Sequence, residues 1–167
     1  MNIWIMRHGE AAFNASTDHQ RSLTEKGKRT AIQQGEWLAQ RLLKQNLQLD
    51  HVIVSPFIRA QQTWQEVQKG MQAVTCNENF AKNLFHNVEN WEGVTPYGNT
   101  STVLDYTQML HHNGASNVLI ISHLPLVYEL VSAFTQHQSQ VHFYPAVIAE
   151  VEWDSQNGIL VTSKMPS

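Results

Sequence analysis

The chain has only one cysteine among its 167 residues, Cys76. A single cysteine cannot form an intramolecular disulfide or a cysteine-based metal cluster, so the composition fits a reducing compartment. Positive charge is also scarce, because 11 Lys and Arg stand against 14 Asp and Glu, for a net charge of −3. Such a chain has no overall basic field that would attract nucleic acid or an acidic membrane surface.

Long apolar runs are missing as well. No stretch approaches the roughly 18 apolar residues of a membrane-spanning helix, and no basic segment precedes the first apolar run as in a signal peptide. Hydrophobic residues make up 42% of the chain and charged residues 15%, which argues against disorder. We therefore expect one soluble, cytoplasmic and monomeric domain over residues 1–167, large enough to bury a good core without cross-links.

Several segments have the composition of β-strands. Short apolar runs predict buried strands at residues 2–6, 51–55 and 117–122. Two alternating runs at residues 146–153 and 159–164 predict an antiparallel hairpin, joined by the polar segment 154–158. A weak strand is also predicted at residues 72–76.

Helical spacing and end signals predict four helices between these strands. Thr24 is a suitable N-cap for the first helix, which should end near residues 44–46. The second helix, which follows the strand at residues 51–55, should end at Gly70. The other three helices are predicted at residues 57–69, from 99–101 to about 112, and from 125 to 135. Residues 77–98 show no sustained period and are predicted to be loop with at most a helical turn.

Strands and helices thus alternate over most of the chain. This alternation predicts an α/β fold, a three-layer α/β/α sandwich whose mainly parallel sheet is covered by helices on both faces. The C-terminal hairpin should form an antiparallel edge of that sheet.

Polar residues follow each of the three strongest predicted strands. Arg7 and His8 follow the first, Arg59 lies just after the second, and His123 follows the third. Because parallel strands bring their carboxyl ends to one edge of a sheet, these four side chains should converge on one crevice. Gly9 would let a ligand approach the backbone there closely.

These residue types suit a phosphoryl group. The guanidinium fork of arginine matches the oxygens of a phosphate, and a neutral histidine can attack phosphorus and hold the phosphoryl group covalently. A second, protonated histidine can donate a hydrogen bond to a phosphate oxygen. The alternatives are polar strand ends without function and a metal site, but neighbouring arginines would repel a dication and no carboxylate lies at these strand ends.

Four motifs, in chain order, resemble those of the histidine phosphatase (phosphoglycerate mutase-like) superfamily, in particular its small SixA-type branch of phosphohistidine phosphatases. They are Arg7-His8-Gly9, Arg21-Ser22-Leu23-Thr24 with Gly27, Ser55-Pro56-Phe57-Ile58-Arg59-Ala60-Gln61-Gln62-Thr63, and Ser122-His123-Leu124-Pro125. Ser22 stands where the branch has proline. A further segment, residues 95–98, looks like another branch element, although Asn99 follows it where aspartate is expected. The resemblance runs from residue 3 to about residue 130.

The resemblance implies a role for each candidate site residue. His8 would carry the phosphoryl group as a covalent intermediate, Arg7, Arg59 and His123 would hold its oxygens, and Arg21 would add a contact from the loop. The family works without metal or organic cofactor. The substrate class that it implies is a phosphohistidine-bearing protein, either a histidine phosphotransfer domain of a phosphorelay or a carrier of a sugar-uptake phosphotransfer system.

No residue has a clear claim to protonate the leaving group. Glu10, Asp18, Glu89 and Glu92 are candidates, but each is more simply interpreted as a solvated carboxylate. A missing acid suits phosphohistidine, because imidazole, whose conjugate acid has a pKa of about 6.5, leaves more readily than an alkoxide. The alternatives are a phosphomonoesterase or mutase acting on a small metabolite, and a non-catalytic phosphate-binding module.

Overall fold

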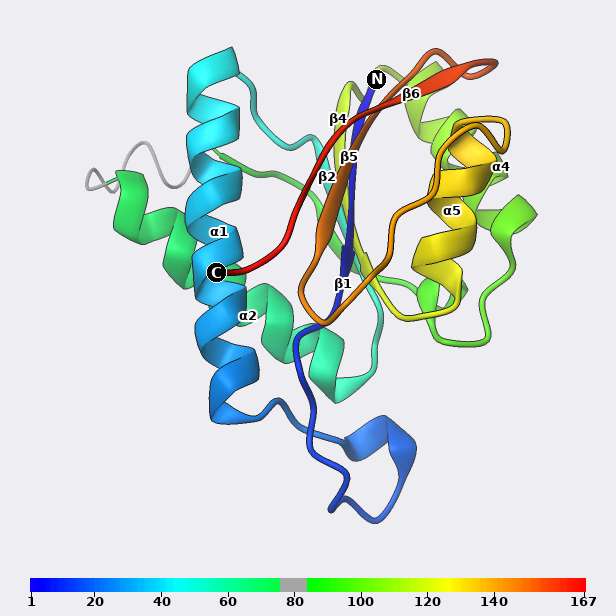
Figure 1. Ribbon diagram of the computed structural model, residues 1–167. Coiled ribbons are helices and arrows are strands. Elements are labelled where there is room, and N and C mark those ends of the chain that lie inside the picture. The colour runs from blue at the N-terminus through cyan, green and yellow to red at the C-terminus, as the bar shows by residue number, and fades with distance from the viewer. Residues whose placement is uncertain (76–83) are drawn as a thin grey trace.

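The computed structural model describes residues 1–75 and 84–167 (Figure 1). Its strands form one sheet: β1 (Asn2–Arg7), β2 (His51–Val54), β3 (Val88–Asn90), β4 (Asn117–Ser122), β5 (Ile148–Trp153) and β6 (Gly158–Lys164). The order across the sheet is β3-β2-β4-β1-β5-β6. The first four of these are mutually parallel, while β5 and β6 run antiparallel and close one edge. The predicted mainly parallel sheet with an antiparallel edge hairpin is confirmed.

Helices cover both faces of this sheet, as Figure 1 shows. One face carries α1 (Glu25–Gln45) and α2 (Ile58–Thr75), and the other carries α4 (Thr100–His112) and α5 (Leu126–Phe134). Two short 3-10 turns, η1 (Asp18–Gln20) and η2 (Glu92–Val94), lie in loops. Within the described residues, no helix is both long and apolar enough to traverse a lipid bilayer.

The alternation of side chains along β1 explains the three layers. Ile3 and Ile5 belong to the buried cluster on the α4 and α5 side, whereas Trp4 and Met6 belong to the cluster under α1 and α2. Because successive side chains of a strand point to opposite faces, one fully apolar strand supplies both cores. The central strands are therefore buried on both faces, as parallel sheets require.

The helix ends follow the signals in the sequence. The Thr24 side chain accepts a hydrogen bond from the Gly27 amide at 3.0 Å, and Asn99 caps α4 in the same way through the Thr102 amide at 3.2 Å. Asn46, with φ 56°, ends α1 in the left-handed conformation that asparagine tolerates. The predicted cap of α1 is confirmed, and of the three residues at which the third helix was predicted to begin, Asn99 is the cap.

The prediction that Gly70 ends the second helix is wrong, because α2 continues to Thr75. Gly70 serves packing instead: a Cβ there would lie 2.0 Å from the Ile32 carbonyl oxygen of α1, and one at Gly35 would lie 2.1 Å from that of Val67. The two glycines let α1 and α2 approach closely. The weak strand predicted at residues 72–76 is therefore helix up to Thr75, and Cys76 lies outside the described residues.

The predicted loop 77–98 also contains a strand. Residues 77–83 lie outside the described part, but β3 pairs in parallel with β2 at the edge of the sheet. Its three residues are too few, and too exposed, to produce a recognisable period. The predicted helical turn is present as η2.

The hairpin begins later than predicted. β5 starts at Ile148, because Ala146 has a left-handed backbone with φ 67°. The Ala146 amide donates to the carbonyl oxygen of His8 at 3.0 Å. The chain entering the hairpin is thereby tied to the backbone at the carboxyl end of β1.

Candidate active site

The carboxyl ends of β1, β2 and β4 meet at the lower edge of the sheet in Figure 1. Arg7 pairs with Ser122 and Val54 with Ile121, so the three strands end at the same level. The His8 amide extends this pairing by donating to the Ser122 carbonyl oxygen at 3.0 Å. The residues at and directly after these strand ends therefore lie together, as predicted, and we call the cluster of Arg7, His8, Arg59 and His123 the crevice.

His8 is held in a single tautomer. Its Nδ1 lies 2.7 Å from the Gly9 carbonyl oxygen, which can only accept, so Nδ1 carries the proton and Nε2 keeps a lone pair. The Nε of Arg59 donates to that lone pair at 3.2 Å. Burial, together with the charges of Arg59, Arg7 and Arg21, lowers the pKa of His8 to about 3 although the bond to Gly9 opposes this. The ring is neutral at physiological pH, as a nucleophile must be.

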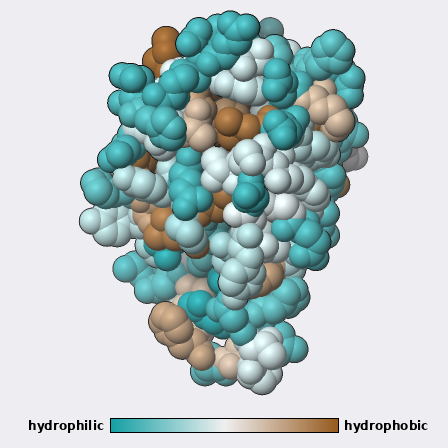
Figure 2. Space-filling view, turned by 90° about the vertical axis from the view of Figure 1, so that its right-hand side faces the viewer, coloured by the Kyte–Doolittle hydropathy of each residue, from teal (hydrophilic) through white to brown (hydrophobic). Residues whose placement is uncertain are grey.

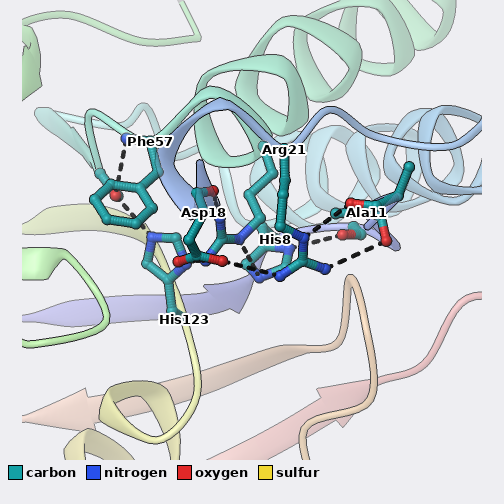
Figure 3. A network of polar contacts seen from close by, with 10 residues as sticks. His8, Ala11, Asp18, Arg21, Phe57 and His123 are labelled. Carbon is teal, nitrogen blue, oxygen red and sulfur yellow. Dashed lines mark hydrogen bonds and ion pairs between the residues drawn. The ribbon is translucent and has the colours of Figure 1, made fainter. Parts of the chain in front are cut away.

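His123 faces His8 across the crevice, with ring centroids 5.0 Å apart (Figure 3). Its Nε2 lies 2.7 Å from the Ser55 hydroxyl, and its buried Nδ1 has no hydrogen-bond partner among the described residues. Burial, His8 and the arginines lower the pKa of His123 to about 2. The expected protonated ring is therefore neutral here, and an anion beside it would favour the protonated form.

Arg59 lies in the first turn of α2 and is almost fully buried. All three of its nitrogens donate: Nε to His8, Nη1 to the Asp18 carbonyl oxygen at 2.7 Å, and Nη2 to the Asp18 carboxylate at 3.2 Å. Its guanidinium carbon also lies 5.0 Å from the centre of the Phe57 ring. Arg59 is thus fixed between Nε2 of His8 and the loop before α1.

Arg21 reaches the same place from that loop. Its Nη1 pairs with the Asp18 carboxylate at 3.2 Å, and its Nε donates to the Ala12 carbonyl oxygen at 2.8 Å. The guanidinium group lies 4.2 Å from the centre of the exposed Phe13 ring. Figure 3 shows the Asp18 side chain turned toward Arg21, so the two arginines share one carboxylate.

Arg7 approaches from the opposite side, where its Nη1 donates to the Phe143 carbonyl oxygen at 2.8 Å. Its buried Nε has no hydrogen-bond partner among the described residues. Burial and the charges of Arg59 and Arg21 lower the pKa of Arg7. Three guanidinium groups thus surround two neutral imidazoles, which creates a strongly positive crevice suited to a polyanion.

A hollow of about 400 Å³ adjoins Arg7. It is lined by Arg7, Leu124, Tyr128, His142, Phe143 and Tyr144. Figure 2 shows that the side carrying α4 and α5 is mostly hydrophilic, with apolar groups in separate patches. The loop between β1 and α1 forms the projection at the lower end of both views.

The four carboxylates considered as proton donors to the leaving group differ in whether they contact the crevice. Glu10 accepts a hydrogen bond from the Thr24 hydroxyl at 2.7 Å, and Glu89 accepts one from the Tyr106 hydroxyl, where burial and this carboxylate raise the pKa of Tyr106 to about 12. Glu92 is exposed in η2. Among the described contacts, only Asp18 of the four reaches a residue of the crevice.

Sequence reasoning assigned no role to three residues that support the crevice. The Thr63 hydroxyl accepts from the Gly9 amide at 3.0 Å and donates to the Arg59 carbonyl oxygen at 2.7 Å, tying β1 to α2. Ser55 positions His123, and Phe57 packs edge-on against that ring at 5.1 Å. All three lie in the Ser55–Thr63 motif: Ser55 and Phe57 directly precede α2, and Thr63 lies in its second turn.

The chain resembles known proteins over nearly its whole length. A family model described as histidine phosphatase superfamily (branch 1) matches residues 3–97. The "phosphohistidine phosphatase SixA homolog" of Haemophilus influenzae is 42% identical, and the alignment covers 99% of this chain and 97% of that protein. Phosphohistidine phosphatase SixA of Escherichia coli is 36% identical, covering 95% and 89%. A solved structure of the protein histidine phosphatase SixA complexed with tungstate has a TM-score of 0.84 at 35% identity, covering 99% and 97%.

Proposed function

The chain belongs to the histidine phosphatase superfamily, branch 1, and on this basis we propose that it is a phosphohistidine phosphatase acting on a phosphorylated protein. The observation that carries the proposal is the fixed tautomer of His8, whose Nε2 lone pair faces Arg59 inside a crevice of three arginines. Two relatives named as SixA phosphohistidine phosphatases support this choice of substrate.

In the first step, the Nε–H group of Arg59 releases Nε2 of His8, and the freed lone pair of that nitrogen attacks the phosphorus atom of the substrate. The bond from phosphorus to the substrate imidazole breaks, its electron pair remains on the departing nitrogen, and solvent supplies a proton there. The Gly9 carbonyl oxygen accepts from Nδ1 and stabilises the positive charge that develops on the His8 ring. Arg7, Arg21, Arg59 and His123 hold the phosphoryl oxygens, where their charge is worth most in a crevice with little water.

In the second step, water attacks the phosphorus atom of phosphorylated His8. The phosphorus–nitrogen bond breaks, the electron pair returns to Nε2, and inorganic phosphate leaves. Both steps use only protein groups and water. A covalent intermediate replaces one difficult displacement with two easier ones.

The carboxylates favour a leaving group that needs no dedicated acid. Glu10 and Glu89 are engaged elsewhere. For Asp18, burial favours the neutral form, but hydrogen bonds from Arg21 and Arg59 outweigh it and lower the pKa of the carboxyl group. Asp18 is therefore ionised near neutral pH and unsuited to donate a proton, whereas imidazole departs without one more easily than an alkoxide does.

The partner in this proposal is a histidine phosphotransfer domain of a phosphorelay or a phosphotransfer-system carrier, met in the cytoplasm by a monomeric phosphatase. Their phosphohistidine is presented on a protein surface, and the hollow next to Arg7 adjoins the crevice from the outside of the protein. A relative with 35% identity forms a complex with tungstate, a tetrahedral oxyanion shaped like phosphate, which also supports a phosphoryl site.

A phosphate-release assay tests the proposal. Wild-type protein, His8→Ala and the control His112→Ala, which changes an exposed histidine, are compared on phosphohistidine proteins and on small phosphomonoesters. We expect release from phosphohistidine proteins by the wild type and the control, no release by His8→Ala, and an acid-labile phosphate on His8 after rapid quenching. Efficient turnover of phosphomonoesters with none of phosphohistidine proteins would favour a metabolite phosphatase. Phosphate binding without turnover would indicate a binding module.

A further inference from the structure

The Asp18 carboxylate occupies the two guanidinium groups that a phosphoryl group would need. One carboxylate oxygen lies 3.2 Å from Nη1 of Arg21, and the other lies 3.2 Å from Nη2 of Arg59. The Asp18 carbonyl oxygen adds a contact of 2.7 Å to Nη1 of Arg59. Asp18 therefore binds Arg59 in the two-pronged manner in which arginine binds phosphate oxygens.

Arg59 is fixed more firmly than Asp18. The Arg59 side chain is 5% exposed and anchored by His8, whereas the Asp18 side chain is 49% exposed. Asp18 begins the three-residue turn η1, which has no buried residue and no side-chain cap. Its internal hydrogen bonds are long, at 3.2 Å from the Gln20 amide and 3.3 Å from the Arg21 amide. Moving this turn separates the His19 ring from the Phe57 ring, 4.8 Å away, but exposes no buried side chain of the turn itself, so its cost is small.

The charges favour an exchange of anions. A single carboxylate neutralises one of the three positive charges that surround His8. A phosphoryl group carries about two negative charges near pH 7 and three oxygens, so it can replace one carboxylate on both guanidinium groups. When phosphate leaves, the carboxylate is the tethered anion nearest to the vacated guanidinium groups, and its high local concentration favours its return.

We propose that Asp18 controls entry and release at the crevice: it leaves Arg59 and Arg21 when a phosphoryl group arrives and returns to expel inorganic phosphate. The identity of the exchanged anion rests on the proposed function, whereas the exchange itself rests on the contacts of Asp18. A purely structural Asp18 would instead hold the two arginines in place for phosphate. The two roles predict opposite changes in phosphate affinity when the carboxylate is removed.

The test compares inorganic phosphate binding to wild type and Asp18→Asn by isothermal titration calorimetry. Because asparagine lacks the competing charge, we expect phosphate to bind about three- to tenfold more tightly. The matched control is Glu25→Gln, which removes one charge from an exposed carboxylate paired with Lys28 at 3.5 Å on α1. The control should leave the dissociation constant within about twofold, since long-range effects of exposed charges are screened.

Steady-state kinetics of the same variant provide a second, independent measurement. In Asp18→Asn, KM for a phosphohistidine protein should fall and inhibition by phosphate should strengthen by the same factor, while kcat falls because release slows. Weaker or unchanged phosphate binding in Asp18→Asn would overturn the proposal. Asp18→Ser, which is too short to bridge the arginines, carries the same prediction, so a folding defect in one variant leaves the other as the test.

The calorimetric experiment also separates this proposal from the proposed function, because it requires no turnover. Tighter phosphate binding in Asp18→Asn, with no activity of the wild type on any phosphohistidine protein, would uphold the exchange and reject the phosphatase. Full phosphatase activity with unchanged phosphate affinity in Asp18→Asn would do the reverse.

Discussion

Two arginine–carboxylate pairs in this protein have similar chemistry and different anchoring. In the interior, Glu150 of β5 accepts from Arg41 of α1 at 3.1 and 2.5 Å and from the Trp4 indole at 2.8 Å. At the edge of the sheet, Asp18 accepts from Arg21 and Arg59. Glu150 is 3% exposed on a central part of the fold, whereas Asp18 is half exposed on a short turn. Both sites pair a carboxylate with arginine, so the difference lies in how the carboxylate is anchored. The buried Glu150 joins the sheet to α1, whereas the half-exposed Asp18 can give up its arginines to a phosphoryl group.

The largest expected effect is on turnover at the crevice, and it should appear without a matching loss in the free energy of unfolding. His8→Asn removes the attacking nitrogen while keeping a side chain of similar shape, so turnover of a phosphohistidine protein should fall at least about 1,000-fold. Because the His8 ring is held neutral in a buried positive crevice, its loss should not lower the free energy of unfolding by more than about 1 kcal/mol. Activity assays and urea unfolding measure the two effects.

The same pair of measurements has an outcome that rejects this view. Residual turnover above one-tenth of the wild type would mean that His8 is not the nucleophile. A large loss of stability together with activity would make His8 a structural residue of the crevice, in the manner of Glu150.

The interior pair should behave in the opposite way. Glu150→Gln leaves the partly buried Arg41 without a counter-charge, and we expect a loss of about 1–3 kcal/mol in the free energy of unfolding. Turnover of the folded protein should stay within about twofold, since the pair contacts no residue of the crevice. Glu152→Gln, an exposed carboxylate on the same strand, is the control and should leave stability unchanged.

Most of the residues gathered in the crevice follow from the sequence, but the contacts between them do not. Arg7, His8, Arg59 and His123 were predictable because each follows a strong apolar run, and parallel strands share an edge. Thr24 was recognisable as a cap. The contact between Asp18 and Arg59 joins residues 41 positions apart through an irregular turn, so no period or motif indicates it.

The errors in the secondary structure have a related cause. Gly70 has the local character of a helix end, yet it lies mid-helix because α1 passes within contact distance of its backbone. β3 has only three residues, two of them exposed, and exists only because β2 offers an unpaired edge. In both cases a tertiary neighbour decides the structure, and a local pattern contains no information about that neighbour.

Acid should affect the crevice more than the surface. His8 and His123 have pKa values near 3 and 2 in the folded protein and about 6.5 when unfolded, so the unfolded chain binds more protons below pH 6.5. The neutral rings therefore contribute fully to the free energy of unfolding above pH 6.5. As the pH falls from 6.5 toward the folded pKa values, the free energy of unfolding decreases by about 1.4 kcal/mol per pH unit for each histidine. Urea unfolding of the wild type between pH 7 and 4.5 measures the slope.

Variants test whether the histidines of the crevice cause the pH dependence of the free energy of unfolding. His123→Asn should reduce it, whereas His112→Asn, which changes an exposed histidine, should not. Saturating phosphate should also flatten the slope, because an anion raises the folded pKa of His123. A slope that is identical in His123→Asn and the wild type would show that other groups titrate.

The smallest effect concerns the rim beside the crevice. Tyr144, which is 61% exposed, lines the hollow next to Arg7 and offers an apolar contact to a docking protein. Tyr144→Ser should lower kcat/KM for a phosphohistidine protein about threefold and leave kcat/KM for the small substrate phosphoramidate unchanged, because only the protein reaches the rim. The control is Ile159→Ser, a similarly exposed apolar residue on β6. Equal losses on both substrates would mean that Tyr144 acts on the crevice itself, through the backbone at Phe143 that holds Arg7, and that the hollow contributes nothing to docking.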